Sequence, residues 1–316
     1  HPFPIREIRV IRGLKIAIRG SRADNTGYMR IQALLIVALL FLAPAAHVAQ
    51  QTATLVPLER IADGVELHRF DDPSLLDPAG PVSVQALRLD PKKVTLDIGV
   101  AADKLPARET VPQIAARRGA IAAINAGFFV LANGAPSAML KVRGQLIQGT
   151  SRPRGAVGFM ERRGSTVLLF DRLTVEKTKA VYRPRLGSSA NDWARASGAV
   201  SGAGLLLLNG REFTDWTEER ITAGFDTARH PRTMIGEGGG AIWLVTIDGR
   251  QPALSLGMNF SEMKRLARRL GLRSALNLDG GGSTTMVVKG NVVNHPSDPA
   301  GARPVSDAVL VLPRKQ

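Results

Sequence analysis

Short apolar runs with alternating polar positions recur along the chain from residue 55 onward. They are bounded by glycine, proline, asparagine or aspartate, a pattern typical of strands joined by turns. Strands are predicted over residues 82–90, 93–101, 120–129, 232–236, 241–250, 274–279 and 307–312. Hairpins are predicted over residues 140–149, about Arg143-Gly144, and over 156–170 and 285–294.

Two segments place apolar residues at helical spacing instead. Residues 110–119 predict one helix, which closes at its final glycine. Residues 261–271 predict the clearest helix, with Ser261 as its N-cap and Gly271 at its end. Its apolar stripe consists of Met263, Leu266, Ala267 and Leu270.

In residues 172–225 the apolar positions follow neither the alternation of a strand nor the spacing of a helix. Within this segment, residues 188–198 predict a long loop. No repeat of 20–50 residues divides the chain. Strands outnumber helices in the segments that can be interpreted. The pattern therefore predicts a single α+β domain, with strand-rich mixed sheets and a few flanking helices.

The first 49 residues are excluded from this domain. Residues 29–49 start with Met29 and a basic residue, continue through an apolar core and end in small residues, the layout of a secretory signal peptide. The apolar core is shorter than the ~20 residues that a membrane span needs. Residues 1–28 are interpreted as a non-native upstream extension. The domain is thus predicted over residues 50–316 of a secreted or periplasmic protein, with membrane contact only through an uncleaved leader.

Charge and cysteine content narrow the classes of partner and chemistry. The chain carries 42 Lys and Arg against 27 Asp and Glu, a bias that favours anionic partners such as phosphates or acidic glycans. Its basic residues are scattered, no nucleic-acid-binding motif is present and only 5% of residues are aromatic, so no nucleic-acid partner is predicted. The lack of cysteine excludes thiol nucleophiles and Cys-ligated zinc.

The stretch ALNLDGGGSTTMVV, residues 275–288, places an acid and three glycines directly after a predicted buried strand. A two-residue turn needs fewer glycines. Consecutive glycines let another group approach the backbone closely, and their N–H groups can bind an anion. A second run, GEGGG at residues 236–240, has no buried acid before it and predicts an ordinary turn. We therefore predict a functional site at residues 279–284 only.

Five segments occur in an order that resembles the phosphodiester glycosidase family. They are INAGFF, RHPRTMIG, VTIDGRQ, NLDGGGSTTMVV and RPVSDAVLV. The resemblance covers roughly residues 55–312, matches poorly over 172–225, and departs at Ala126, where the family often has glycine. It implies hydrolysis of a sugar-1-phosphodiester to a free sugar and a phosphomonoester. The family's known case removes N-acetylglucosamine from such a diester.

The implied chemistry needs a carboxylate and a grip on phosphate. Cleavage at the anomeric carbon passes through an oxocarbenium-like state, and Asp279 is the candidate carboxylate that steers water or stabilises that state. A turn aspartate is the alternative for Asp279. Arg232 is predicted to bind the phosphate through two parallel bonds, and Arg303 is a second phosphate ligand or a surface ion pair. Asp248 and Asp307 are candidate second acids, although an Asp-Gly pair at 248 is also typical of a hairpin turn.

Other polar residues in these segments are predicted to bind substrate. Asn125 ends a strand and could bind sugar hydroxyls or fill a turn. His230 is a candidate general base or a structural histidine beside proline. The remaining candidates are Thr233, Gly280, Gly281, Gly282, Ser283 and Thr284.

No cofactor is required by these motifs, although Ca²⁺ or Mg²⁺ bound by Asp248, Asp279 or Asp307 stays open. The prediction is an exported glycosidase that acts on a phosphate-linked glycan or glycolipid. The alternative is a non-catalytic envelope protein that binds phosphoglycans, which would need the glycines and Arg232 but not Asp279 as an acid. For a third class, a phosphodiesterase cutting the P–O bond, a metal cluster rich in His and Asp would be expected.

Overall fold

The structure, a computed structural model, describes residues 59–314. The predicted upstream extension (1–28), the leader (29–49) and the first residues of the predicted domain (50–58) lie outside the described residues. The described residues belong to one compact unit that is rich in strands and has a few helices, which confirms the predicted α+β class. No helix within residues 59–314 is long and apolar enough to span a membrane.

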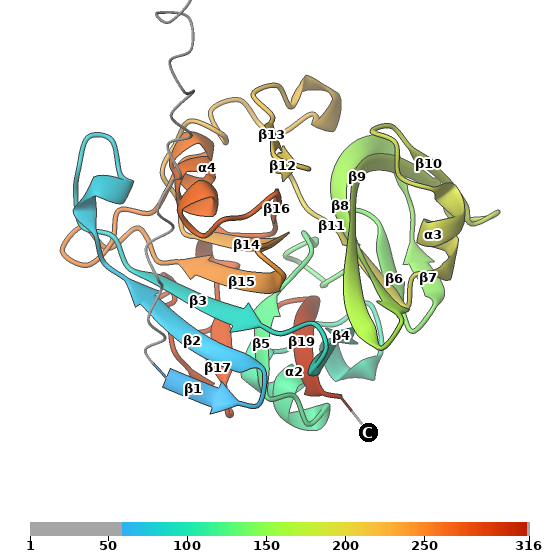
Figure 1. Cartoon of the computed structure of the whole chain (residues 1–316), viewed down its shortest axis with the longest axis horizontal. Helices are drawn as coiled ribbons and strands as arrows, with labels where there is room; N and C mark the ends of the chain where they lie inside the picture. The colour runs from blue at the N-terminus through green and yellow to red at the C-terminus, as the bar shows by residue number, and fades with distance from the viewer. Residues whose placement is uncertain (1–58, 315–316) are drawn as a thin grey trace, which may run out of the picture. The chain divides into compact units, whose positions relative to one another are not determined.

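Within residues 59–314, nineteen strands form three sheets in which all neighbouring strands are antiparallel (Figure 1). The eight-stranded sheet has the order β1 (Glu59–Ala62), β2 (Val65–Phe70), β3 (Val84–Leu89), β15 (Ala241–Ile247), β14 (Arg232–Gly238), β16 (Ser274–Asn277), β12 (Leu205–Leu208) and β13 (Arg211–Glu212). The six-stranded sheet has the order β10 (Val181–Pro184), β9 (Ser165–Glu176), β8 (Thr150–Arg162), β11 (Gly198–Ser201), β6 (Leu140–Val142) and β7 (Gln145–Gln148). The five-stranded sheet has the order β18 (Asn291–Val292), β17 (Met286–Val288), β5 (Ala122–Asn125), β19 (Asp307–Pro313) and β4 (Val94–Val100).

The predicted hairpins are confirmed, and their turns explain their register. Arg143-Gly144 joins β6 to β7 with φ of 47° and 80°, and Arg163-Gly164 joins β8 to β9 with φ of 49° and 73°. Two consecutive left-handed residues match the twist of antiparallel strands. The pair Gly239-Gly240 joins β14 to β15 with φ of 58° and 76°, and a Cβ on either glycine would meet no atom within 4 Å. The GEGGG run is therefore the ordinary turn that was predicted.

The described residues contain three α-helices, α2 (Val111–Arg117), α3 (Ala190–Arg195) and α4 (Phe260–Arg269), with α2 packed on β5 and β19. The predicted apolar stripe of α4 is buried and Gly271 follows the helix with φ of 71°. The predicted N-cap, Ser261, is wrong. Asn259 accepts from the backbone N–H of Glu262, whose carboxylate accepts from the backbone N–H of Asn259. This reciprocal pair starts the helix earlier than the serine would.

The predicted loop at residues 188–198 is also wrong, because it contains α3 and begins β11. Trp193 of α3 is fully buried and donates from its indole to the Ser188 hydroxyl, 2.7 Å away. The buried carboxylate of Asp171 accepts from three backbone N–H groups between Arg185 and Ser188. A tertiary anchor of this kind orders a segment that carries no periodic pattern of its own.

The eight- and five-stranded sheets meet at the end of β16. Leu278 donates its N–H to Thr233 O of β14, and the next residue, Asp279, donates its N–H to Ala126 O at the end of β5. The chain therefore crosses from one sheet to the other within two residues. Asn125 secures this crossing, since its side chain donates to Asp279 O and accepts from Thr233 Oγ1, at 2.7 Å each. The loops that follow these strands converge on Asp279.

Candidate active site

Asp279 lies at this junction and is partly exposed as a residue. Its Oδ1 accepts from the N–H of Gly280 at 2.9 Å. Burial raises the pKa of Asp279 from 3.8 to about 7, and the Ser283 hydroxyl, the Gly280 N–H and the Arg303 charge only partly offset that rise. The charge of Asp307 raises the pKa further. A carboxyl group that is half-ionised near neutral pH can take up or release a proton during a reaction.

At each of the three positions of the run, a neighbouring group lies where a larger residue would place its Cβ. A Cβ on Gly280 would lie 2.6 Å from Pro231 O, and one on Gly281, whose φ is +61°, would lie 3.1 Å from Arg250 Nη2. A Cβ on Gly282 would lie 2.1 Å from both Arg303 Nη2 and Asp298 Oδ1. The close approach that the glycines allow is therefore made by two arginines of this chain. Glycine here makes room for cations beside Asp279.

The predicted cradle of glycine N–H groups for an anion stays a prediction, and two of the three glycine N–H groups already donate within the protein. Gly280 N–H donates to Asp279, Gly281 N–H to Pro231 O, and Ser283 N–H to Gly280 O. Three of the donors that an anion would need are thus already bound within the protein. The Thr284 side chain is an available donor, because its buried hydroxyl has no hydrogen-bond partner among the described residues.

Arg303 lies over Gly282 and forms a two-pronged ion pair with Asp298, with Nε–Oδ2 of 2.7 Å and Nη2–Oδ1 of 2.9 Å. Both side chains are about a quarter exposed, at 27% and 28%. The Arg303 charge acts on Asp279 and lowers its pKa. The ion pair that the sequence interpretation offered as one alternative is therefore present, and the role of Arg303 as a phosphate ligand stays a prediction.

Arg250 is a candidate that the sequence interpretation did not single out. It follows β15 in the left-handed region, with φ of 61°, is exposed, and forms no side-chain hydrogen bond or ion pair with any described residue. Its guanidinium lies against Gly281, and its charge helps to lower the pKa of His230. A non-glycine residue at positive φ is strained and often marks a functional position. The only sequence signal was its place in the VTIDGRQ segment.

Arg232, predicted to grip phosphate, is instead a structural residue. Its Nε donates to Met258 O at 2.9 Å, and its Nη2 donates to Phe225 O and Ala228 O at 2.5 and 3.0 Å. The guanidinium lies 4.5 Å from the ring centroid of Phe225 and 4.9 Å from that of Phe260, and is 1% exposed. These contacts commit Arg232 to holding the 225–228 loop, because a buried guanidinium with carbonyl and aromatic partners cannot turn toward a ligand without losing them.

Asp248 has a comparable structural role. It is fully buried, and its Oδ1 accepts from Asn294 Nδ2 and the His295 N–H, each at 2.9 Å. Its Oδ2 lies 3.3 Å from His295 Nδ1. This carboxylate therefore anchors the segment that leads to Asp298 and Arg303, and its prediction as a second acid is not supported by these contacts.

Asp307 is close enough to Asp279 for its charge to raise the pKa of Asp279, and its role as a second acid stays a prediction. It is 1% exposed, its Oδ1 accepts from the Gly127 N–H at 2.7 Å, and its Oδ2 has no partner among the described residues. Burial raises the pKa of Asp307, and the Gly127 N–H opposes that rise. When it is ionised, the negative charge of Asp307 disfavours the ionisation of Asp279.

The predicted sugar ligands Asn125 and Thr233 are fully buried and bonded to each other. They act as the cross-link between sheets described above, so their prediction as substrate ligands is not supported. His230 is partly exposed and stacks on Phe225 at a centroid distance of 6.2 Å. Burial and the charges of Arg232 and Arg250 lower the pKa of His230, which favours its neutral form at the rim of the site.

Within residues 59–314, no group of three or more His, Asp or Glu side chains is arranged to hold a metal ion. The described acids Asp248, Asp279 and Asp307 therefore do not form one common ligand set. The predicted Ca²⁺ or Mg²⁺ stays a prediction.

The raised pKa of Asp279 has a consequence for stability. A carboxyl group whose pKa is higher in the folded chain stabilises the fold below about pH 4 and loses this contribution as the pH rises through about 7. Asp279→Asn removes this titration. We expect the variant to unfold with the same free energy as the wild type at pH 4, and to be more stable by roughly 1–3 kcal/mol at pH 8. Urea unfolding at both pH values measures the difference, and a variant less stable at pH 8 would contradict the buried-acid assignment.

Comparison with known proteins shows what this chain is similar to. Residues 118–312 match the family model described as phosphodiester glycosidase. The bovine N-acetylglucosamine-1-phosphodiester alpha-N-acetylglucosaminidase is 27% identical over 201 residues, which are 60% of this chain and 35% of the bovine protein. The chain therefore spans about a third of the length of that relative.

Two solved structures share the fold. The catalytic domain of the zebrafish enzyme of the same name, auto-inhibited by its pro-peptide, matches with a TM-score of 0.63 and 22% identity, over 82% of this chain and 87% of that one. A Burkholderia pseudomallei protein described as exported matches with a TM-score of 0.60 and 20% identity, over 74% of each chain. At these identities the likeness shows the fold alone.

Proposed function

Because the chain belongs to the phosphodiester glycosidase family, we propose that it is an exported hydrolase that cleaves the glycosidic C–O bond of a sugar-1-phosphodiester. The substrate class is a phosphate-linked glycan or glycolipid. One observation carries the proposal: a partly exposed Asp279, with a pKa of about 7, lies beside a glycine run on which two arginines are packed. The site thus combines a proton acceptor with a cationic place for the phosphate.

In the proposed reaction Asp279 accepts a proton from the attacking water. The water oxygen forms a bond to the anomeric carbon while the bond from that carbon to the phosphate oxygen breaks. The electron pair of the broken bond stays on the phosphate, which leaves as a phosphomonoester. Such a leaving group needs charge stabilisation more than protonation, and this is what neighbouring guanidinium groups supply.

Arg250 and Arg303 have different parts in this scheme. Arg303 is held in place by Asp298 and lies over Gly282. Arg250 is exposed and unpaired among the described residues, so its donors are available to a phosphate without the loss of an existing bond. We therefore assign the main phosphate contact to Arg250, in place of the predicted Arg232.

Arg250→Ala is expected to lower kcat/KM for a sugar-1-phosphodiester by about 10–100-fold, because an arginine–phosphate contact contributes roughly 1.5–3 kcal/mol. Steady-state kinetics and thermal unfolding of the full chain measure the effect. Arg163→Ala is the matched control, since Arg163 is also exposed, unpaired and left-handed, with φ of 49°. Equal kinetics for wild type and Arg250→Ala would remove Arg250 from the site.

A further inference from the structure

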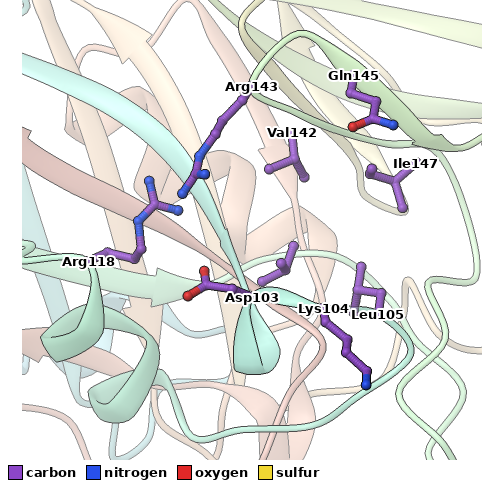
Figure 2. Close-up of a pocket in the computed structure, with 9 residues that line it drawn as sticks. Asp103, Lys104, Leu105, Arg118, Val142, Arg143, Gln145 and Ile147 are labelled. Carbon is purple, nitrogen blue, oxygen red and sulfur yellow. The ribbon is translucent and has the colours of Figure 1, made fainter.

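A pocket of about 310 Å³ lies apart from the glycine run (Figure 2). It is bounded by the 3₁₀ turn η2 (Ala101–Asp103) and the residues that follow it, by Arg118 at the end of α2, and by the β6–β7 hairpin. One of its walls, Val100, is the strand partner of Asp307. The pocket is therefore one strand away from the acids of the candidate active site, although Asp279 does not line it.

The walls of this pocket are aliphatic. It is lined by Val100, Leu105, Val142 and Ile147. Val100 is buried, and the other three are partly exposed. Val142 and Ile147 come from the two strands of the hairpin, whereas Val100 and Leu105 come from the end of β4 and from the loop after η2. Such a surface suits the carbon face of a sugar ring or another weakly polar group.

The charges around the pocket are mainly positive. Lys104, Arg118 and Arg143 line it together with one acid, Asp103. That acid is already bound by Arg117 outside the pocket, with Nε–Oδ2 of 2.7 Å. Neither Lys104 nor Arg143 has a side-chain hydrogen bond or ion pair with any residue in the described range. Two cations of the pocket are therefore uncompensated.

Figure 2 shows the guanidinium groups of Arg118 and Arg143 pointing toward one another. Arg118 keeps one bond to Asp97, with Nη2–Oδ2 of 2.7 Å, which fixes its position. Two like charges that face each other repel, and an anion between them removes this repulsion. Guanidinium groups bind phosphate through paired N–H donors, so the arrangement is that of a phosphate clamp beside an aliphatic wall.

We propose that this pocket is an accessory site for the phosphomonoester group of a phosphorylated sugar. The phosphate lies between Arg118 and Arg143, and the sugar ring rests on Leu105 and Ile147. The anion site follows from the geometry alone, whereas the choice of a sugar phosphate as its ligand rests on the proposed function. The pocket keeps a net positive charge, because Arg143 and Lys104 are uncompensated while Arg118 is paired with Asp97, and a dianionic phosphate fits this charge better than a monoanionic diester does.

The test is a titration of the full chain with glucose 6-phosphate, followed by the methyl NMR resonances of leucine, isoleucine and valine. We expect shifts at Leu105, Val142 and Ile147, and no shifts with glucose alone. Arg143→Ala should weaken binding at least tenfold. Arg163→Ala is the control, because Arg163 occupies the equivalent left-handed position of the β8–β9 turn and is followed by glycine.

Equal weakening by the two arginine variants would reduce the effect to general charge and overturn the proposal. So would the absence of binding, or shifts confined to the surroundings of Asp279. Hydrolysis of a small sugar-1-phosphodiester by Arg143→Ala is measured in parallel and is expected to be unchanged. A wild type that hydrolyses the diester but does not bind glucose 6-phosphate would reject only the accessory site. A wild type that binds glucose 6-phosphate at this pocket but does not hydrolyse the diester would reject only the proposed activity.

Discussion

Asp279→Asn is expected to hydrolyse a sugar-1-phosphodiester about a thousandfold more slowly than the wild type, within the 10²–10⁴-fold range of general acid–base catalysis. The amide has nearly the same shape as the carboxyl group and can still accept a hydrogen bond from the Gly280 N–H. It cannot accept a proton from water. The variant should therefore keep the fold and the substrate affinity and lose turnover.

The measurement is kcat and KM for both proteins, together with their thermal unfolding. Asp63→Asn serves as the control, since Asp63 is 77% exposed and, among residues 59–314, pairs only with Lys93 beside the β1–β2 turn. If the wild type and Asp279→Asn both fail to hydrolyse the diester but bind it equally, the chain is a phosphoglycan-binding protein. If Asp279→Asn retains full turnover, the acid at this site is another residue and our assignment fails.

Gly282→Ala should lower activity by about 10–100-fold with little loss of stability, because small displacements of catalytic groups have effects of this size. The added Cβ would overlap Arg303 Nη2 and Asp298 Oδ1, each 2.1 Å away. Both atoms are at the ends of flexible side chains, so the ion pair can move aside without disturbing the backbone. That movement takes the Arg303 charge away from Asp279.

Gly239→Ala in the GEGGG turn gives the opposite result and is the matched control. Gly239 has φ of +58° and open space around its Cβ position. Alanine there is strained by roughly 1–2 kcal/mol in the left-handed region, which lowers stability but leaves the site unchanged. Thermal unfolding and kinetics on both variants separate the two kinds of glycine. A Gly282→Ala protein with normal kinetics would show that the Arg303–Asp298 pair has no part in catalysis.

The strands were the most predictable part of the fold, because alternation reports directly on one buried face. The hairpins at Arg143-Gly144 and at 285–294 followed from the same pattern and from their turn residues. The segment around Trp193 was not predictable, since the groups that order it come from distant positions such as Asp171. No local pattern records such partners.

The site residues also divide into those recognisable from the local sequence and those whose role depends on distant partners. Asp279 and the glycines were recognisable because an acid and three glycines after a strand are locally unusual. Arg232 was assigned to phosphate because a sequence shows an arginine but not the aromatic rings of Phe225 and Phe260 that enclose it. Arg250 was missed for the converse reason, since its exposure and positive φ exist only in the folded chain.

The central claim is that water attacks the anomeric carbon with Asp279 as the proton acceptor. Hydrolysis of a sugar-1-phosphodiester in ¹⁸O water, followed by mass spectrometry of both products, tests it most directly. We expect the label in the free sugar with the wild type, and no labelled product above background with Asp279→Asn. Label in the phosphate would mean cleavage of the P–O bond and would contradict the glycosidase mechanism.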